Sequence, residues 1–181
     1  MRAFIAIDIP EEIRKGISGV SAEVAMPGIV LVKPEVMHIT MQFLGEIDEH
    51  TSENVIAALD QLDFESFNVS LRGIGYFSPD FIRVLFVSLS EGEKKLKALY
   101  DSIGSLLASK GVVFDGNDYT PHVTIARAKY LKDKTSIIKF VERYKTYDFG
   151  SFTVGNVKLK KSVLGSSGPT YTDLYSKALM P

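Results

Sequence analysis

Two short segments of the chain place a histidine and a threonine two residues apart, with apolar residues at the alternate positions. They are His38-Ile39-Thr40-Met41 and His122-Val123-Thr124-Ile125. Successive side chains of a β-strand point to opposite faces, so each histidine would share one face with its threonine while the apolar residues enter a core. Each segment therefore offers an imidazole that carries a proton near neutral pH, beside a hydroxyl that can donate to a phosphate oxygen.

The repetition of this pattern makes it specific. A single histidine on a strand is usually a packed or surface residue, but two of the three histidines here occupy the same context. The third, His50, lies in an acidic stretch at the start of an expected helix, and we interpret it as a surface residue. The chain has no cysteine and no His-x-x-His spacing, so the sequence predicts no metal site and no cofactor.

Composition is ordinary for a soluble globular protein, with 45% hydrophobic and 24% charged residues in 181. The apolar run at residues 2–8 is too short for a secretion signal, and no stretch approaches the ~20 apolar residues of a membrane span. We expect one domain over residues 1–181, cytoplasmic and monomeric, without a membrane partner.

Charge is distributed unevenly along the chain. From Arg127 onward there are 11 basic and 4 acidic residues, although the net charge of the whole protein is −1. This asymmetry predicts a face that attracts a polyanion, the alternative being an ordinary solvated surface.

Hydrophobic periodicity predicts a mixed fold. One expected helix starts at Pro10, and three others cover residues 49–62, 91–109 and 135–144. A turn is expected at Ser78-Pro79-Asp80. Expected strands cover 2–8, 30–32, 37–44, 67–74, 82–89, 122–128, 149–159 and 171–179. Long helices among hairpin-like strands indicate an α+β protein with antiparallel sheets.

Several segments together resemble the 2′-5′ RNA ligase / RNA 2′,3′-cyclic phosphodiesterase family of the two-histidine phosphoesterase superfamily. The resemblance covers nearly the whole chain. Its segments are residues 2–8, 32–40, 43–46, 119–127, 157–162 and 168–171. It implies two pseudo-symmetric lobes, each an antiparallel sheet with helices on its outer face, which flank a central cleft.

The resemblance also implies an activity, hydrolysis of 2′,3′-cyclic phosphate ends of RNA or oligonucleotides. In such proteins His38 would be the proton donor and His122 the proton acceptor, without a metal. Thr40 and Thr124 would hold phosphate oxygens, and Arg127 would neutralise charge. Strict alternation places Arg127 on the face opposite His122, so it needs a strand end or a bulge to reach the cleft.

The sequence leaves the stacking residue and the exact function open. The chain has Leu31 where such proteins often have tryptophan, so Phe4, Tyr76 or Tyr119 would have to stack on a base or ribose. The alternatives to the cyclic phosphodiesterase are a non-catalytic RNA-binding module and a sibling phosphoesterase that acts on a small cyclic nucleotide or a 2′-5′ oligonucleotide. If a 5′-hydroxyl replaced water, the same site would form a 2′-5′ linkage without ATP.

Overall fold

The computed structural model describes residues 1–78, 80–116 and 118–181. Pro79, in the turn expected after Ser78, therefore lies outside the described residues. The helices are α1 (Glu11–Ser21), α2 (Glu49–Asp60), α3 (Glu93–Ser109) and α4 (Lys134–Arg143). The strands are β1 (Arg2–Asp8), β2 (Ile29–Leu31), β3 (His38–Glu46), β4 (Phe67–Tyr76), β5 (Val84–Glu91), β6 (Val123–Ala128), β7 (Asp148–Val154), β8 (Asn156–Gly165) and β9 (Gly168–Ala178).

The strands form one curled antiparallel sheet that consists of two similar halves. Its order is β7-β4-β5-β6-β3-β1-β8-β9, with β2 paired to β6. One half ends in β6 and the other in β3, and these two strands meet in the middle through the pairing of Ile39 with Val123. Two strand–helix–strand units, β1-α1-β3 and β5-α3-β6, each end in a strand of the central pair. Their helices contact strands of the opposite half, α1 with β6 and β7 and α3 with β3.

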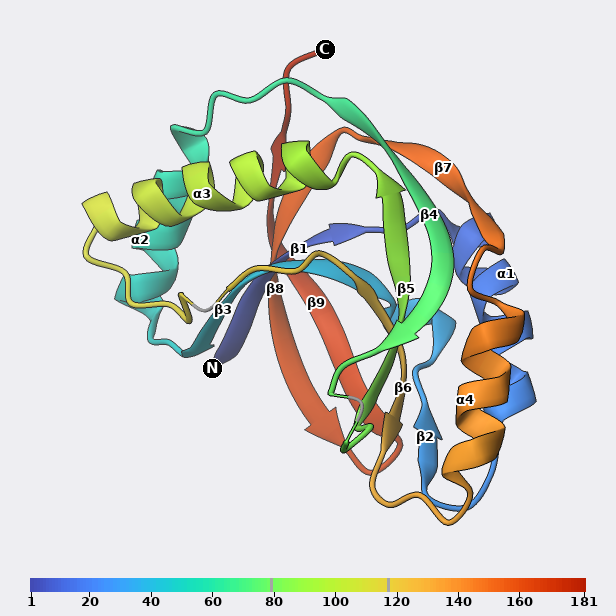
Figure 1. The fold of residues 1–181 in the computed structure, drawn as a ribbon. Coiled ribbons are helices and arrows are strands. Elements are labelled where there is room, and N and C mark those ends of the chain that lie inside the picture. The colour runs from blue at the N-terminus through green and yellow to red at the C-terminus, as the bar shows by residue number, and fades with distance from the viewer. Residues whose placement is uncertain (79, 117) are drawn as a thin grey trace.

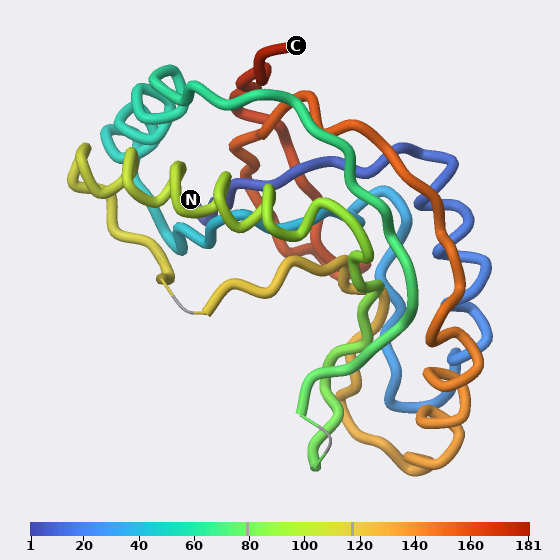
Figure 2. Tube along the Cα trace, turned by 45° about the horizontal axis from the view of Figure 1, so that its top comes forward, coloured from blue at the N-terminus to red at the C-terminus, as the bar shows by residue number. Residues whose placement is uncertain are grey.

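Helices cover the outer face of each half. Figure 1 shows α1 and α4 together on one side of the molecule and α2 and α3 on the other. The tube in Figure 2 shows the sheet curling between these two helical layers. The α+β class and the two-lobed antiparallel architecture expected from the sequence are thereby confirmed.

The core lies between the sheet and the helices, as the alternation of the two histidine segments predicts. Ile39 and Met41 are at most 1% exposed, and Val123 and Ile125 are fully buried. The histidines and threonines therefore project from the opposite side of the sheet, which we call the concave face.

Most elements lie within a few residues of the predicted ranges, but one prediction was wrong. The single strand expected over residues 149–159 is two strands, β7 and β8, which separate at Gly155. β7 pairs with β4 and β8 pairs with β1, so Gly155 marks the point where the chain crosses from one half of the sheet to the other. A continuous apolar pattern hid this change of neighbours.

Among the described residues, no helix combines the length and the apolar character needed to cross a membrane.

Candidate active site

The two histidine segments lie next to each other in the middle of the sheet. Ile39 on β3 is paired with Val123 on β6 in an antiparallel register. The alternation along each segment turns His38, Thr40, His122 and Thr124 away from the core, next to this pair. All four polar side chains thus gather on the concave face, and a charge on His122 is close enough to lower the pKa of His38.

His38 is fixed by hydrogen bonds at both ring nitrogens. Its Nδ1 lies 2.7 Å from the carbonyl oxygen of Val36, and its Nε2 lies 3.0 Å from Oγ1 of Thr40. A carbonyl oxygen can only accept, so Nδ1 carries the proton, and Nε2 of the neutral ring accepts from the Thr40 hydroxyl. Burial lowers the pKa of His38 to about 4, although the bond to Val36 opposes this effect.

His122 has the same local geometry. Its Nδ1 donates to the carbonyl oxygen of Thr120 across 2.7 Å, which leaves Nε2 with its lone pair for another partner. Burial lowers the pKa of His122, the bond to Thr120 raises it, and the guanidinium of Arg127 lowers it further. Burial therefore favours the neutral form of both imidazoles.

Arg127 reaches the concave face because β6 contains a β-bulge. In its pairing with β5, Leu85 lies opposite Ala126 while the next residue, Phe86, lies opposite Thr124. Ile125 is thus an extra residue that changes the alternation, and Arg127 comes to lie opposite Val84, on the same face as Phe86. Its charge acts on the pKa of both His122 and Tyr171, which places it beside the histidines.

Aromatic rings surround each histidine. His38 packs against Phe4 and Tyr171, with ring centroids 4.9 and 5.4 Å away. His122 packs against Phe77 and Phe86 at 4.9 and 5.4 Å. These apolar neighbours explain the desolvation of both imidazoles.

Of the three aromatic residues considered from the sequence, only Phe4 contacts a histidine ring. Tyr119 instead stacks on Tyr100 with centroids 4.2 Å apart, and its hydroxyl donates to the sulfur of Met41. Tyr76 packs against the core. Phe77, Phe86 and Tyr171 were missed; Phe86 lies on β5, opposite Thr124.

Four charged residues lie on the concave face next to His38. We call them the ion-pair quartet, Asp8, Lys158, Lys160 and Asp173. Each lysine Nζ contacts both carboxylates, at 2.5 to 2.9 Å. Asp8 is paired directly opposite His38, and Lys160 is only 7% exposed. Burial alone would raise the pKa of Asp8, but the hydrogen bonds from Lys158 and Lys160 outweigh it and lower that pKa.

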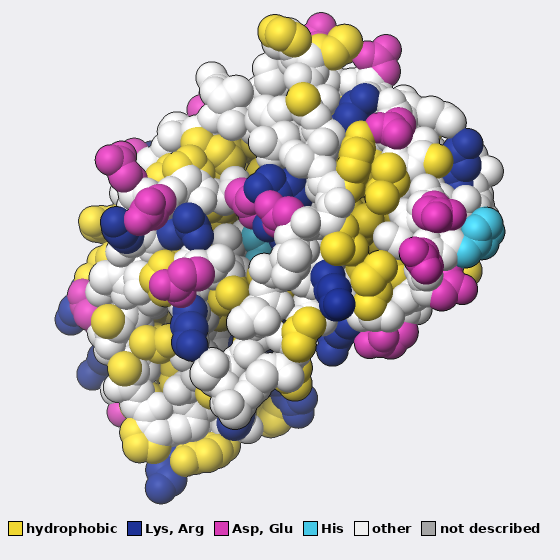
Figure 3. Space-filling view, turned by 180° about the vertical axis from the view of Figure 1, so that it is seen from behind, with side chains coloured by type: hydrophobic (Ala, Val, Ile, Leu, Met, Phe, Trp, Pro, Cys, Tyr) yellow, Lys and Arg dark blue, Asp and Glu magenta, His cyan; other side chains and the backbone are white. Residues whose placement is uncertain are grey.

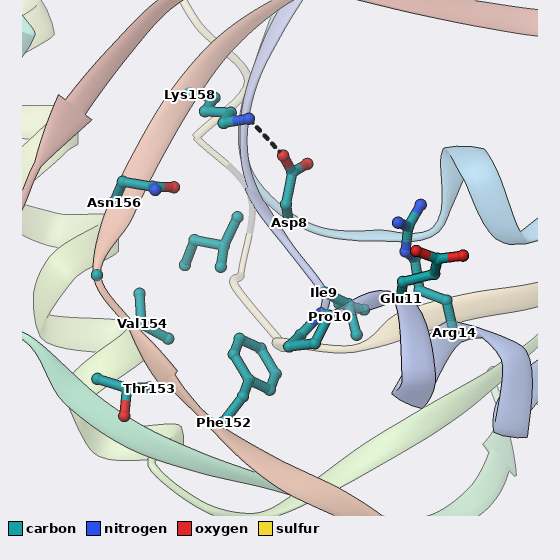
Figure 4. A pocket seen from close by; sticks show the side chains of 12 residues that line it. Asp8, Ile9, Pro10, Glu11, Arg14, Phe152, Thr153, Val154, Asn156 and Lys158 are labelled. Carbon is teal, nitrogen blue, oxygen red and sulfur yellow. Dashed lines mark ion pairs between the residues drawn. The ribbon is translucent and has the colours of Figure 1, made fainter.

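Basic and acidic side chains also gather beside a recessed histidine on the face shown in Figure 3. Beyond the quartet lies a cavity of about 310 Å³ at the junction of β1 and α1. Figure 4 shows the Asp8–Lys158 ion pair at one side of this cavity, with Glu11 and Arg14 of α1 at the other. A second cavity, of about 400 Å³, adjoins Arg127.

The described residues contain no group of three or more His, Asp or Glu side chains that could hold a metal ion.

Comparisons with known proteins identify the family of this chain. A family model described as the AKAP7 2′5′ RNA ligase-like domain matches residues 8–177. A relative from Methanocaldococcus jannaschii named RNA 2′,3′-cyclic phosphodiesterase is 37% identical, over 94% of this chain and 96% of its own length. One of the same name from Aquifex aeolicus is 33% identical, over 95% and 94%.

A solved structure, LigT of E. coli complexed with 3′-AMP, superposes with a TM-score of 0.82 at 24% identity, covering 99% of this chain and 98% of LigT. That likeness concerns the fold alone. With the family model and the relatives taken together, this chain belongs to the family of the AKAP7 2′5′ RNA ligase-like domain.

Proposed function

We propose that the protein hydrolyses the 2′,3′-cyclic phosphate end of RNA to a 2′-phosphate, with His38 and His122 as its acid–base pair. The observation that carries this proposal is the convergence of two neutral imidazoles and two threonine hydroxyls on adjacent strands. Relatives that match over most of the chain carry the name RNA 2′,3′-cyclic phosphodiesterase, which supports the same substrate class.

The reaction requires one proton acceptor and one proton donor on opposite sides of phosphorus. Nε2 of His122 takes a proton from water as the water oxygen bonds to phosphorus. The bond from phosphorus to O3′ breaks, and Nε2 of His38 gives its proton to that oxygen. The product carries a 2′-phosphate and a 3′-hydroxyl, and the proton that His122 gained balances the one that His38 lost.

The charges around the two histidines act on their pKa values in different ways. Arg127 lowers the pKa of His122, which favours the neutral form needed by a base. At His38 the charge of Lys160 lowers the pKa of the imidazole, and the smaller effect of Asp8, which lies opposite His38, raises it. A bound phosphate carries a negative charge that raises the pKa of both rings, so protonation of His38 accompanies substrate binding.

The remaining residues stabilise the charge on the phosphate. Hydroxyls of Thr40 and Thr124 lie on the same face as the imidazoles and can donate to the equatorial oxygens. Arg127 supplies a positive charge at the edge of this group. The same arrangement would join RNA ends if a 5′-hydroxyl took the place of the attacking water.

The decisive experiment measures turnover of an oligoribonucleotide that ends in a 2′,3′-cyclic phosphate, with EDTA present. We expect a 2′-phosphate product, and a loss of ~10²–10⁴-fold in His38→Ala and in His122→Ala, the usual range for one acid or base. His50→Ala, on the exposed side of α2, serves as the control and should retain wild-type turnover.

Other outcomes would favour the alternatives. Tight binding of the oligonucleotide without any turnover would indicate a non-catalytic RNA-binding module. Turnover of a small cyclic nucleotide or a 2′-5′ oligonucleotide in place of this substrate would indicate a sibling phosphoesterase.

A further inference from the structure

Three cations line the cavity that adjoins Arg127. This cavity of about 400 Å³ lies where β5, β6 and β2 end together, and Val30 and Val84 form its apolar part. Its basic group consists of Arg83, Arg127 and Lys129, all exposed.

Backbone hydrogen bonds hold these three residues in place. The amide of Ala128 donates to the carbonyl of Arg83, and the amide of Lys129 donates to the carbonyl of Gly28, both at 2.8 Å. Arg127 is paired with Val84 on one side and with Val30 on the other. The backbone of all three residues is thus held in place. The Cα atoms of Arg127 and Lys129 are about 7 Å apart along the strand direction.

The basic group carries an uncompensated charge. In the part of the chain that the structure describes, none of its members takes part in an ion pair. On the other flank of the histidines, by contrast, Lys158 and Lys160 are each neutralised by two carboxylates. Uncompensated positive charge next to an anion site attracts the part of a polyanion that continues beyond that site.

Exposed apolar surface accompanies this charge. The guanidinium of Arg83 lies over the ring of Phe81, 4.5 Å from its centroid, and Phe81 is 62% exposed. Val30 is 47% exposed although it belongs to a strand. Cations interleaved with exposed aromatic and apolar side chains are the arrangement by which proteins hold single-stranded nucleic acid, through backbone phosphates and base stacking.

We infer that this cavity is a subsite for the RNA strand that precedes the terminal cyclic phosphate. Arg83 and Lys129 bind backbone phosphates of upstream nucleotides, and Arg127 lies between them and the histidines. The inference rests on the proposed function and deepens it, because it makes the substrate an oligonucleotide and not a mononucleotide.

The test compares two substrates with the same reacting end. One is adenosine 2′,3′-cyclic phosphate, and the other is a single-stranded oligoribonucleotide that ends in the same group. The variant is Arg83→Gln with Lys129→Gln, which leaves Arg127 unchanged. A matched control, Lys94→Gln with Lys95→Gln, removes two exposed cations from the start of α3, at the opposite end of β5 from Arg83.

We expect KM for the oligonucleotide to rise roughly 3- to 30-fold in the variant, while kcat/KM for the mononucleotide stays at the wild-type value. The logarithm of oligonucleotide affinity should also fall less steeply with the logarithm of salt, by about 1.4 for two lost contacts to a single strand. The control should match the wild type in both respects.

Three results would overturn the inference. They are an unchanged KM for the oligonucleotide, an equal loss on both substrates, and equal displacement of the oligonucleotide by an acidic peptide of the same net charge. Binding of an oligonucleotide that ends in a 2′-phosphate provides a readout independent of catalysis. If the wild type turned over neither substrate, the proposed function would fail, and the salt dependence of this binding would still decide whether the subsite exists.

Discussion

The two halves of the sheet build the same local structure around two histidines. In each half Nδ1 donates across 2.7 Å to the carbonyl oxygen two residues earlier, and two aromatic rings pack against the imidazole. This backbone bond fixes the tautomer, so that Nε2 of each neutral ring presents a lone pair to the concave face. The two halves therefore share the orientation of the imidazole ring.

The halves differ in the charges that reach the histidine from other strands. His38 lies beside the ion-pair quartet, and its Nε2 is engaged by Thr40. His122 lies beside Arg127, whose charge has no carboxylate partner among the described residues. The duplicated motif thus supplies two similarly oriented imidazoles, and the unequal neighbouring charges act differently on the pKa of each.

The largest expected effect separates the acid from the base. A substrate with sulfur in place of O3′ has a leaving group that departs without a proton, because a thiol has a pKa of about 8.5. We therefore expect His38→Ala to lose less than about tenfold on this substrate, instead of the ~10²–10⁴-fold expected with oxygen. The measurement is single-turnover release of the thiol.

His122→Ala is the control for this prediction, since a missing base slows attack on either substrate. Rescue of His122→Ala instead of His38→Ala would exchange the two roles. Rescue of neither would mean that protonation of the leaving group does not limit the reaction.

A smaller effect should distinguish the two threonines. Thr40→Val and Thr124→Val each remove a donor to a phosphate oxygen and should lower kcat by about 10²-fold. Thr40→Val also releases Nε2 of His38, so it alone should change the pH profile of kcat/KM. Serine at either position keeps the hydroxyl and should restore most of the activity. Equal pH profiles of kcat/KM in both valine variants would show that the Thr40–His38 bond is not formed in solution.

The smallest effect tests the quartet through the pH dependence of kcat. Asp8→Asn removes a charge that raises the pKa of His38 and leaves two lysines with one carboxylate. Both changes disfavour the imidazolium. A general acid sets the alkaline limb of the bell-shaped profile, so this limb should move to lower pH by roughly one unit, and activity above it should fall by up to about tenfold.

Asp173→Asn is the matched control, since it breaks as many ion pairs but lies farther from His38. It should move the same limb less. A shift of the acid limb by Asp8→Asn would contradict the assignment of His38 as the acid.

Much of this site could be predicted from the sequence, because its information is local. The alternation of His38 with Ile39 and of His122 with Val123 fixes which side chains enter the core, and the core positions are confirmed. The pairing of the two segments required the resemblance to a family, since nothing in the alternation itself states that β3 and β6 are neighbours.

What the sequence could not provide depends on register and on contacts across strands. The bulge at Ile125 reverses the expected direction of Arg127, and a period of two contains no sign of it. In the quartet Asp8 pairs with two lysines that lie far along the chain, Lys158 and Lys160, so the sequence gives no signal of their partnership. Phe77 lies just past the end of β4, where no alternation assigned it to a face.

The meeting of β3 and β6 has a mechanical consequence. Among the described residues only Ile39 and Val123 are paired across this junction, whereas β1 and β3 are paired at seven positions. The histidines and threonines therefore straddle the weakest joint of the sheet. If the proposed function holds, a phosphate bound by both strands would link the two halves across this joint, and its binding free energy would add to their cohesion.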